Sequence, residues 1–227
     1  MTILSQVKRA VIVAPHPDDE VLGCGGTMAR LAAMGAEVHV LLMTRGMEPR
    51  FSSAQVERVL AEVKEAHAML GVTRLHCLDL PAAELDAMPI ADVNHRVGEI
   101  LAELQPDTLF LPFIGDIHFD HQVAFTAAMV YARPRSDKAP SRIYAYETLS
   151  ETNWYAPGVT PAFTPNMFVD ISQEIALKLR AFGCFRSQVK AFPDERSLEA
   201  LEALARMRGA TVFRNAAEAY QIIRQID

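Results

Sequence analysis

Short apolar runs alternate with segments of helical periodicity over the first 130 residues of the chain. Each apolar run is continuous, which is typical of strands that are covered on both faces. The four runs cover residues 9–14, 38–43, 75–78 and 108–111. Between them, the three- and four-residue spacing of amphipathic helices recurs in residues 25–36, 52–70 and 91–104. This alternation predicts an α/β fold with a parallel sheet and right-handed crossovers.

The regular alternation ends after residue 130. Residues 131–165 are rich in Pro, Ser, Thr and aromatic side chains, and we expect them to form a lid or a substrate-facing segment. Strand-like pieces are expected at residues 142–146 and 167–169, and helices at residues 172–185, 195–207 and 216–223. Because no repeat, low-complexity tract or linker interrupts the sequence, residues 1–227 are expected to form a single domain.

Composition and charge exclude several classes of function. The 227 residues carry a net charge of −6 and no cluster of Lys and Arg, which argues against nucleic acid and other polyanionic partners. No run approaches the roughly 18 apolar residues of a membrane span, and the first residues lack the layout of a signal peptide. The three cysteines have no CxxC spacing and suit a reducing compartment better than a disulfide framework. We therefore expect a cytoplasmic protein.

Two clusters of acidic residues and histidines follow predicted strands. The first is Pro-His-Pro-Asp-Asp-Glu at residues 15–20, and the second is Gly-Asp-Ile-His-Phe-Asp-His at residues 115–121. Open parallel sheets bind ligands outside the carboxyl ends of their strands, so both clusters can meet at one edge. A hydrolytic zinc site uses three His, Asp or Glu ligands and keeps a fourth position for water. The sequence therefore predicts a metal site built from both clusters.

The spacing within each cluster separates candidate ligands from their neighbours. His16 and Asp19 stand three residues apart, so a turn can bring both to one side while Asp18 points elsewhere. His118 and His121 are also three apart and can share one face at the start of a helix. One histidine of this second pair could bind metal while the other meets the substrate.

Simpler roles for these residues are open as well. Asp18 or Asp19 could cap the helix that follows the first strand, and Asp120 could cap a helix over residues 119–131. Ser53 is a candidate cap of the helix over residues 52–70. The other histidines have no acidic or histidine partner at ligand spacing, so we expect packing or surface positions for His39, His67, His76 and His95.

The two clusters resemble the marks of a known family. The PIG-L or LmbE-like zinc-dependent N-deacetylases carry an AHPDDE motif after the first strand and a later HxDH motif, and similar stretches stand here at residues 15–20 and 118–121. The likeness extends over nearly the whole chain, through residues 23–27, 70–72, 105–107, 187–188, 208–209 and 217–220. The resemblance implies a Rossmann-like three-layer fold with a mostly parallel sheet, one divalent metal per chain, and assembly into a homo-oligomer.

The resemblance also implies a role for each matched residue. Asp18 would be the general base that activates water, His118 the polar partner of the developing oxyanion, and Asp120 the residue that orients a histidine. The zinc ligands would be His16, Asp19 and His121. These roles agree with the chemistry, since zinc polarises a carbonyl and lowers the pKa of bound water to about 7.

Candidate substrate contacts lie in three other places. Arg45 ends the second predicted strand, and Arg58 lies next to Val59, which occupies the helix position where the family usually has an arginine. Residues 144–154 mix aromatic and hydrogen-bonding side chains, as sugar sites often do, and the candidate contacts there are Glu147, Asn153 and Trp154. The aromatic residues of this segment could instead fill a subunit interface.

The expected function is removal of an acetyl group from an N-acetylated amino sugar, such as an N-acetylglucosamine conjugate, by metal-activated water with Asp18 as the base. Two alternatives stay open. The same apparatus would hydrolyse a non-sugar amide, and a Rossmann-like module without catalysis could bind a nucleotide or a metal. A spare carboxylate beside three complete ligands favours catalysis, since a binding protein has no use for it.

Overall fold

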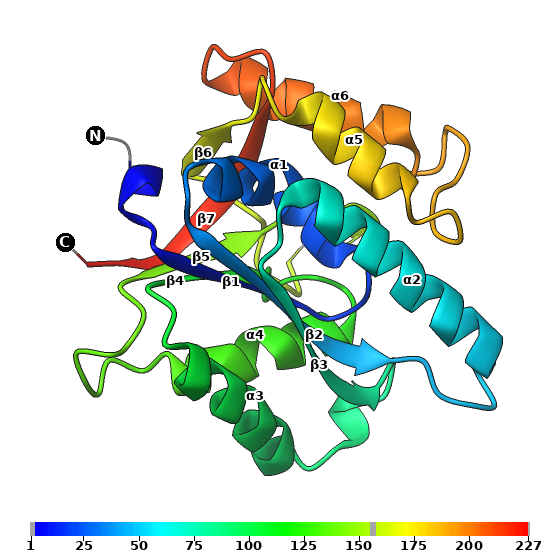
Figure 1. Ribbon diagram of the computed structural model, residues 1–227, viewed down its shortest axis with the longest axis vertical. Helices are drawn as coiled ribbons and strands as arrows, with labels where there is room; N and C mark the ends of the chain where they lie inside the picture. The colour runs from blue at the N-terminus through cyan, green and yellow to red at the C-terminus, as the bar shows by residue number, and fades with distance from the viewer. Residues whose placement is uncertain (1–2, 155–157, 227) are drawn as a thin grey trace.

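A seven-stranded sheet between two layers of helices organises the part of the chain that the computed structural model describes, residues 3–154 and 158–226 (Figure 1). The order across the sheet is β3-β2-β1-β4-β5-β7-β6. The strands are β1 (Arg9–Ala14), β2 (Glu37–Arg45), β3 (Arg74–Pro81), β4 (Thr108–Pro112), β5 (Arg142–Tyr146), β6 (Met167–Asp170) and β7 (Ala217–Gln225). β1 to β5 run parallel, whereas β7 is antiparallel to both of its neighbours. The predicted α/β class with a mostly parallel sheet is confirmed.

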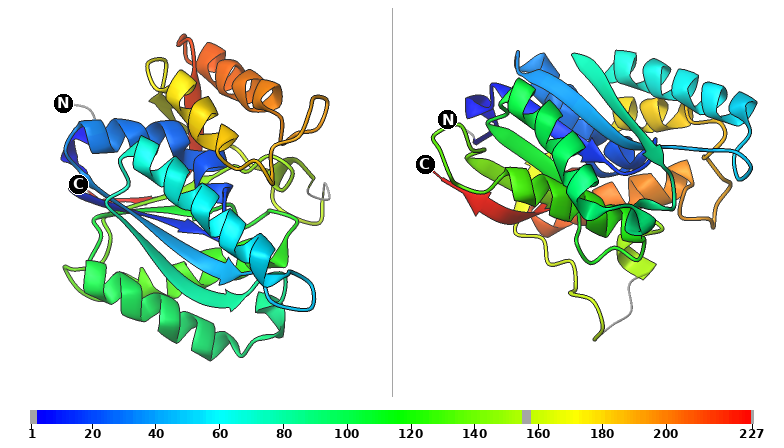
Figure 2. Two further views of the ribbon diagram at one scale, coloured as in Figure 1. Left: turned by 45° about the vertical axis from the view of Figure 1, so that its right-hand side comes forward. Right: turned by 90° about the horizontal axis from the view of Figure 1, so that it is seen from below.

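Helices cover both faces of this sheet (Figure 2). One layer consists of α1 (Asp19–Ala33), α2 (Ser53–Leu70), α5 (Ile175–Gly183) and α6 (Leu198–Thr211), and the other of α3 (Ile90–Leu104) and α4 (Phe119–Tyr131). Short 3-10 turns occur at η1 (Ile3–Gln6), η2 (Leu85–Ala87) and η3 (Thr152–Trp154). Successive residues of β1 alternate between two cores, Ile12 toward α1 and Val13 toward α4. Within the described ranges, no helix has the length and apolar character to cross a membrane.

The edge strand β3 differs from the prediction of strands covered on both faces. His76, Leu78 and Leu80 are buried, whereas Cys77 and Asp79 between them are exposed. Among the strands that the structure describes, β3 has only β2 as a neighbour. Its alternating burial follows because Leu78 and Leu80 pack into the core beside α3, while the opposite face meets solvent.

Two helices begin at residues other than those predicted. α1 begins at Asp19 rather than at residue 25, so the first cluster runs directly into the helix. Its glycine at position 23 permits close packing, since a Cβ there would lie 2.2 Å from the Tyr146 ring. α2 is capped by Ser52 and not by Ser53, because the side chains of Ser52 and Gln55 each accept the other residue's backbone N–H.

The predicted helix over residues 216–223 is wrong, because this part of the chain forms β7. Its short apolar run fits either period, so the sequence pattern alone does not separate strand from helix. Pairing with two partners decides the outcome. Tyr220 lies opposite Tyr146 of β5 on one side and Met167 of β6 on the other.

The segment expected to form a lid, residues 131–165, is only partly at the surface. Its residues 142–146 form β5, which is fully buried within the sheet, so this part belongs to the core. Residues 155–157 of the segment lie outside the described residues. The next two helices are shifted from their predicted ranges, since α5 is shorter and α6 begins after its cap Ser197, whose side chain accepts the Ala200 N–H.

Candidate active site

Two loops meet at the carboxyl edge of the sheet. Residues 15–18 connect β1 to α1, and residues 113–118 connect β4 to α4. β1 and β4 are parallel neighbours, with Ile12 opposite Phe110, so their loops leave the sheet side by side. Thr44 of β2 fixes the first loop, because its hydroxyl donates to the Pro15 carbonyl at 2.7 Å. The two predicted clusters therefore lie together.

Three side chains from these clusters bring their ligand atoms within 4.8 Å of one another: His16, Asp19 and His121. Asp19 Oδ2 lies 3.2 Å from His121 Nε2 and 3.4 Å from His16 Nδ1. Asp19 and His121 are completely buried, yet Asp19 Oδ1 and His121 Nε2 have no hydrogen-bond partner among the described residues. Buried polar atoms without partners are costly. A cation would satisfy both, and two imidazoles with one carboxylate are a donor set that suits zinc.

Each histidine of this group also contacts a second carboxylate through its other ring nitrogen. His16 Nε2 lies 2.8 Å from Asp120 Oδ2, and His121 Nδ1 lies 2.8 Å from Asp116 Oδ2. Asp116 is held in turn by the Thr152 hydroxyl, which donates to its Oδ1 at 2.6 Å. Metal-binding histidines commonly donate their second N–H to such a carboxylate, which orients the ring and raises its basicity. The arrangement thus matches that of a metal centre.

The electrostatics of the group favour positive charge. Burial alone would lower the pKa of His16, but its hydrogen bonds to Asp120 and Asp19 raise it to about 9. Burial likewise opposes charge on His121, and the nearby Asp19 and Asp116 carboxylates raise its pKa well above the usual range. The His121 charge holds the pKa of Asp19 well below its usual range despite burial. Because metal ligands must be deprotonated, a cation here competes with protons for the same electron pairs.

His118 occupies the border between this group and solvent. Its Nδ1 accepts the Asp120 backbone N–H at 3.1 Å, so His118 caps α4 and the alternative prediction of Asp120 as the cap is wrong. Burial and the adjacent His16 lower the pKa of His118. Neutral His118 with Nδ1 as acceptor carries its proton on Nε2. His118 can therefore donate a hydrogen bond from Nε2.

A second combination of ligand atoms, from His16, His118 and Asp120, also lies within 4.8 Å. Its carboxylate is already in use, because Asp120 accepts the backbone N–H groups of Ala83 at 2.7 Å and Leu85 at 3.1 Å in addition to His16. None of the partnerless buried atoms belongs to this combination. The group with Asp19 and His121 is therefore the better cation site.

Asp18 lies beside the candidate ligand group of His16, Asp19 and His121 without belonging to it. Its side chain is completely buried, its Oδ2 accepts from Arg196 Nη1 at 2.7 Å, and its Oδ1 has no hydrogen-bond partner among the described residues. Burial raises the pKa of Asp18 well above its usual range, against the opposing charge of Arg196. The backbone of Asp18 has φ 108°, a conformation that costs a non-glycine residue free energy and persists where its surroundings enforce it.

The last residue of the first cluster has a supporting role. Glu20 Oε2 accepts the Asp18 backbone N–H at 3.2 Å, and Glu20 Oε1 lies 2.8 Å from His67 Nε2 of α2. His67 is buried, in agreement with the predicted packing position, and its acidic partner lies 47 residues away, outside any ligand spacing along the sequence. His39 and His76 also contact each other, at 3.2 Å between Nδ1 and Nε2.

The polar substrate candidates after β5 already have protein partners. Both Glu147 oxygens accept from the Arg208 guanidinium, at 2.8 and 2.6 Å. Asn153 accepts the Ser150 N–H at 3.1 Å through Oδ1 and donates to Glu195 through its amide nitrogen. These side chains shape the loop beside the site, and any contact with a substrate would compete with their present bonds.

The remaining substrate candidates are open to solvent. Arg45 at the end of β2 and Arg58 in α2 are exposed, and within the described residues neither side chain makes a hydrogen bond or an ion pair. Trp154 in η3 is 59% exposed. Its backbone N–H donates to the Glu151 carbonyl, which also accepts the Ile117 N–H of the second cluster's loop, both at 3.4 Å. The backbone of Trp154 is thus linked to the loop that carries the second cluster.

Two residues of the site were not predicted from the sequence. Asp116 belongs to the second cluster and stands five residues before His121. This spacing does not by itself indicate a contact, and only the folded loop brings the Asp116 carboxylate to the His121 ring. Arg196 gave no signal, because it is 178 residues from Asp18 and lies in no motif with it.

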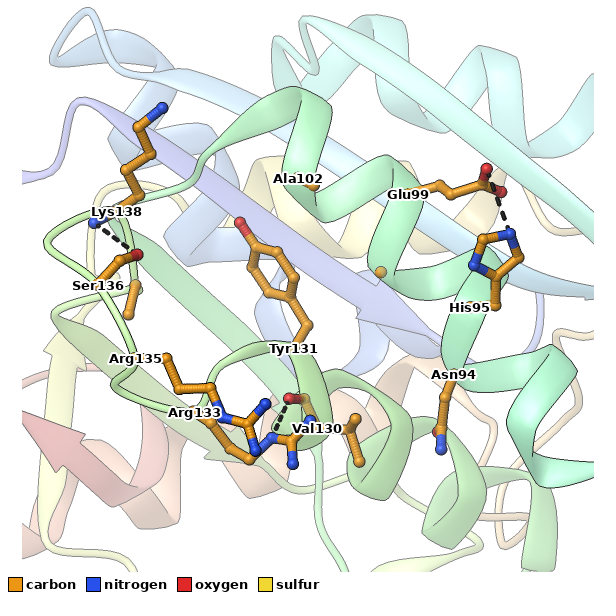
Figure 3. Close-up of a pocket in the computed structure, with 12 residues that line it drawn as sticks. Asn94, His95, Glu99, Ala102, Val130, Tyr131, Arg133, Arg135, Ser136 and Lys138 are labelled. Atoms are coloured by element: carbon orange, nitrogen blue, oxygen red, sulfur yellow. Dashed lines mark hydrogen bonds and ion pairs between the residues drawn. The ribbon is translucent and has the colours of Figure 1, made fainter.

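A cavity of about 490 Å³ lies elsewhere, between α3, α4 and residues 133–139 (Figure 3). Polar and charged side chains such as His95, Glu99, Arg133 and Arg135 surround it, and Arg133 Nε donates to the Val130 carbonyl at 2.7 Å. None of its lining residues belongs to the candidate ligand group. The buried atoms without hydrogen-bond partners, rather than this cavity, therefore mark the candidate site.

Known proteins share this sequence pattern and fold. A family model described as GlcNAc-PI de-N-acetylase, PIG-L, matches residues 11–132, which include both clusters. The chain is 29% identical to diacetylchitobiose deacetylase of Thermococcus kodakarensis, over 84% of this chain and 73% of that protein. It is 27% identical to the probable N-acetyl-alpha-D-glucosaminyl L-malate deacetylase 2 of Bacillus cereus, over 83% of this chain and 87% of that protein.

Solved structures extend the likeness to nearly the whole chain. N,N'-diacetylchitobiose deacetylase of Pyrococcus horikoshii, solved with an inhibitor, superposes with a TM-score of 0.76 at 25% identity, over 97% of this chain and 85% of that chain. A 4-carboxy-2-hydroxymuconate hydratase of Pseudomonas putida superposes with a TM-score of 0.74 at 21% identity, over 97% of this chain and 98% of that chain. The second likeness concerns the fold alone, so the reaction must be argued from the site.

Proposed function

The chain belongs to the PIG-L family of de-N-acetylases, enzymes that act on amide bonds, and on this premise we propose that it is a zinc-dependent hydrolase that removes the acetyl group from an N-acetylated amino sugar. The two relatives described above are named for diacetylchitobiose and for a glucosaminyl malate. Their names share an N-acetylated glucosamine unit and differ in what is attached to it. An N-acetylglucosamine-type conjugate is therefore the substrate class that we propose, and residues 1–227 would act as one catalytic domain.

The observation that carries this proposal is the set of buried polar atoms without partners at one place. Asp18 Oδ1, Asp19 Oδ1 and His121 Nε2 all lack a hydrogen bond among the described residues. Two of these atoms belong to proposed metal ligands, and the third belongs to the carboxylate beside them. A metal ion together with a water molecule would satisfy all three. A site that only binds metal has no need of the third atom.

Asp18 is the proposed general base and acid. A divalent metal held by His16, Asp19 and His121 would supply a Lewis acid that polarises the acetyl carbonyl and favours ionisation of water. Asp18 Oδ1 takes the proton from the attacking water and passes it to the nitrogen of the departing amine as the C–N bond breaks. The products are acetate and the free amino sugar. Asp120 and Asp116 keep the two histidine rings in place during this exchange.

His118 is the proposed partner of the carbonyl oxygen. Its Nδ1 is occupied by the Asp120 backbone N–H, so Nε2 is the atom free to donate. A hydrogen bond from Nε2 would strengthen as negative charge develops on the carbonyl oxygen, which is the condition for accelerating the chemical step. The exposed Trp154, with Asn153 nearby, would contact the sugar ring.

Acetate release from a panel of N-acetylated compounds tests the proposal. The metal-loaded protein should release acetate from N-acetylglucosamine in free, nucleotide-linked or glycoside-linked form. A matched set of simple acetanilides and N-acetyl amino acids serves as the comparison. Activity confined to this second set would replace the sugar by a non-sugar amide, and no acetate from either set with one metal bound per chain would favour a binding module.

The location, the metal and the oligomeric state of the protein are further parts of this proposal. Cys24 and Cys184 are buried and Cys77 is exposed, all as free thiols, which agrees with the reducing cytoplasm that we propose as its location. Zinc is the proposed metal, and metal analysis of protein purified without added metal tests it. Assembly into a homo-oligomer stays a prediction, which light scattering of the purified protein would check.

A further inference from the structure

Arg196 lies in the connection between α5 and α6, and its guanidinium reaches across the fold to Asp18. Its Nη1 donates to Asp18 Oδ2 at 2.7 Å and to Gln188 Oε1 at 3.3 Å. Its Nε donates to Ser150 Oγ at 3.0 Å, and the side chain is 21% exposed. One guanidinium thus joins the loop after β1, the loop after β5 and its own segment.

The backbone around Arg196 is fixed by hydrogen bonds. Its N–H donates to Asp194 Oδ1 at 2.9 Å, and its carbonyl accepts the Lys190 N–H at 3.1 Å. The next residue, Ser197, is buried and caps α6 by accepting the Ala200 N–H at 3.1 Å. The guanidinium therefore extends from a fixed point of the chain rather than from a free loop.

The neighbouring Glu195 links chain segments, as Arg196 does, but it does not contact Asp18. Glu195 Oε2 accepts the Ser150 N–H at 2.8 Å, and Oε1 accepts from the Asn153 amide. Glu195 thereby joins two of the three segments that Arg196 joins, its own and the loop after β5, but within the described residues it makes no hydrogen bond to the first cluster. Linking the segments does not require the contact with Asp18, so that contact needs its own explanation.

Each acid of the first cluster has a different basic partner. Glu20 lies 2.8 Å from His67, and Asp19 lies 3.2 Å from His121. Arg196 is the cation at 2.7 Å from Asp18. It touches only Oδ2, and because a carboxylate group is planar, fixing Oδ2 also fixes the direction of the partnerless Oδ1.

We propose that Arg196 is a positioning residue of the hydrolysis, which holds Asp18 by Oδ2 so that Oδ1 faces the attacking water and the departing nitrogen. This inference rests on the proposed role of Asp18 as proton carrier. Arg196 does not touch the reacting atoms. Its contribution is geometric, since a catalytic group misplaced by about 1 Å can cost about 10²-fold in rate.

Kinetics of Arg196→Gln and Arg196→Lys, with Arg186→Ala as the control, test this proposal. Arg186 lies in the same connection but pairs with the exposed Glu65 at 3.0 and 3.1 Å, away from Asp18. Arg196→Gln should lower kcat about 10²-fold and change KM by less than about threefold, because substrate binding does not use Asp18. Arg196→Lys keeps the charge and should lose less, and Arg186→Ala should match the parent protein.

The Asp18→Asn background distinguishes positioning from a structural link between loops. In that background Arg196→Gln should lower kcat by less than about twofold, since residues that act as a unit are not additive. A loop link would lower kcat by the same factor in both backgrounds, and that result would overturn the proposal. Guanidinium ion added at millimolar concentration should partly restore Arg196→Ala in a saturable way and leave Arg186→Ala unchanged.

A crystal structure of Arg196→Gln gives a readout that does not depend on activity. The Asp18 carboxylate should rotate away from its present direction while His16, Asp19 and His121 stay in place. The absence of acetate release from any sugar by the parent protein would contradict the proposed function, whereas the direction of the Asp18 carboxylate in this structure tests separately whether Arg196 holds it. An unmoved Asp18 carboxylate would overturn the inference, and Arg196→Ala serves in its place if Arg196→Gln does not fold.

Discussion

Two regions of this molecule bring a pair of histidines together in nearly the same geometry, at opposite edges of the sheet. At the carboxyl edge the rings of His16 and His121 have centroids 5.4 Å apart with planes at 43°. Near the start of β2 and β3 the rings of His39 and His76 also have centroids 5.4 Å apart, with planes at 44°. Ring geometry alone does not distinguish the two pairs.

The carboxylates around the two pairs differ. His16 and His121 share Asp19 between them, and each has a further carboxylate at 2.8 Å on its other nitrogen. His39 has Glu37 at 3.5 Å, a half-exposed side chain that also binds Arg9. The pKa of His16 and of His121 is raised by these acids, whereas burial lowers the pKa of His39 and His76.

Acidic neighbours decide whether two adjacent histidines form a cation site. Two imidazoles in contact and buried become neutral. The same imidazoles backed by carboxylates form a region where positive charge is favoured, which either protons or a metal can supply. The acidic neighbours, more than the histidines, therefore define the candidate site.

The largest expected effect comes from removing one histidine of each pair. His121→Ala should lower bound metal from one per chain to nearly none and abolish acetate release, because the site loses a ligand. His76→Ala should keep both metal and activity. Metal analysis after dialysis checks the pair of variants. One metal per chain in His121→Ala would rule out the proposed ligand set.

A change beside the ligands should separate metal binding from chemistry. Asp18→Asn should keep one metal per chain and lower kcat by roughly 10²- to 10⁴-fold, since it removes the proton carrier and spares the ligands. Asp18→Asn keeps the shape of the side chain, so the fold should be unaffected. Acetate release and metal content are measured on the same samples. Full activity would contradict the mechanism.

Removing a backing carboxylate from each pair should have a smaller effect. Asp116→Asn should weaken metal affinity by roughly 10- to 100-fold, because His121 loses the acid that orients its ring. Glu37→Gln should leave the affinity unchanged, since within the described residues neither His39 nor His76 belongs to a candidate group of metal ligands. Competition with a coloured chelator gives both affinities. Equal effects of the two substitutions would remove the distinction between the two regions.

The smallest effect concerns the pH dependence of stability at the His39 pair. A histidine whose pKa is lowered in the folded state contributes stability that is present above its unfolded pKa of about 6.5 and is lost as the pH falls below it. Replacing His39 and His76 by Gln should therefore reduce the loss of unfolding free energy between pH 7.5 and 5.5, by less than about 1 kcal/mol. Urea unfolding at constant metal concentration measures the unfolding free energy at both pH values. A larger loss of unfolding free energy in the variant than in the parent protein would contradict this prediction.

The sequence predicted those parts of the site whose positions follow from neighbouring strands. Residues 15–20 and 115–121 each follow a central strand, so the parallel sheet brings them together once its topology is known. Asp116 could not be assigned a role, because only the folded loop turns it toward His121. Arg196 could not be found at all, because its contact with Asp18 depends on how the connection between α5 and α6 crosses the site.

The fold was predictable where the apolar pattern allowed one reading. β1 and α4 match their predicted ranges, since a continuous buried run and a helix with a clear start leave little choice. The helix prediction for residues 216–223 failed because their sequence fits both the helical and the strand period. Pairing of β7 with its two neighbouring strands selects the extended form. The strand predicted at residues 142–146 is confirmed as β5, and because β5 is buried within the sheet, the lid prediction for residues 131–165 does not hold for this part.

The separation of His16 from His121 along the chain has a consequence for folding. A cation held by both residues would close a loop of about a hundred residues, and so would act as a reversible cross-link between the ends of β1 and β4. To bring the three ligands together, the unfolded chain would have to close this long loop at an entropic cost, so it binds the cation poorly. Metal would then select the folded chain by mass action, with about 2.7 kcal/mol gained at a hundredfold excess over its dissociation constant. The concentration of free metal would then set the folding stability of this protein as well as its rate.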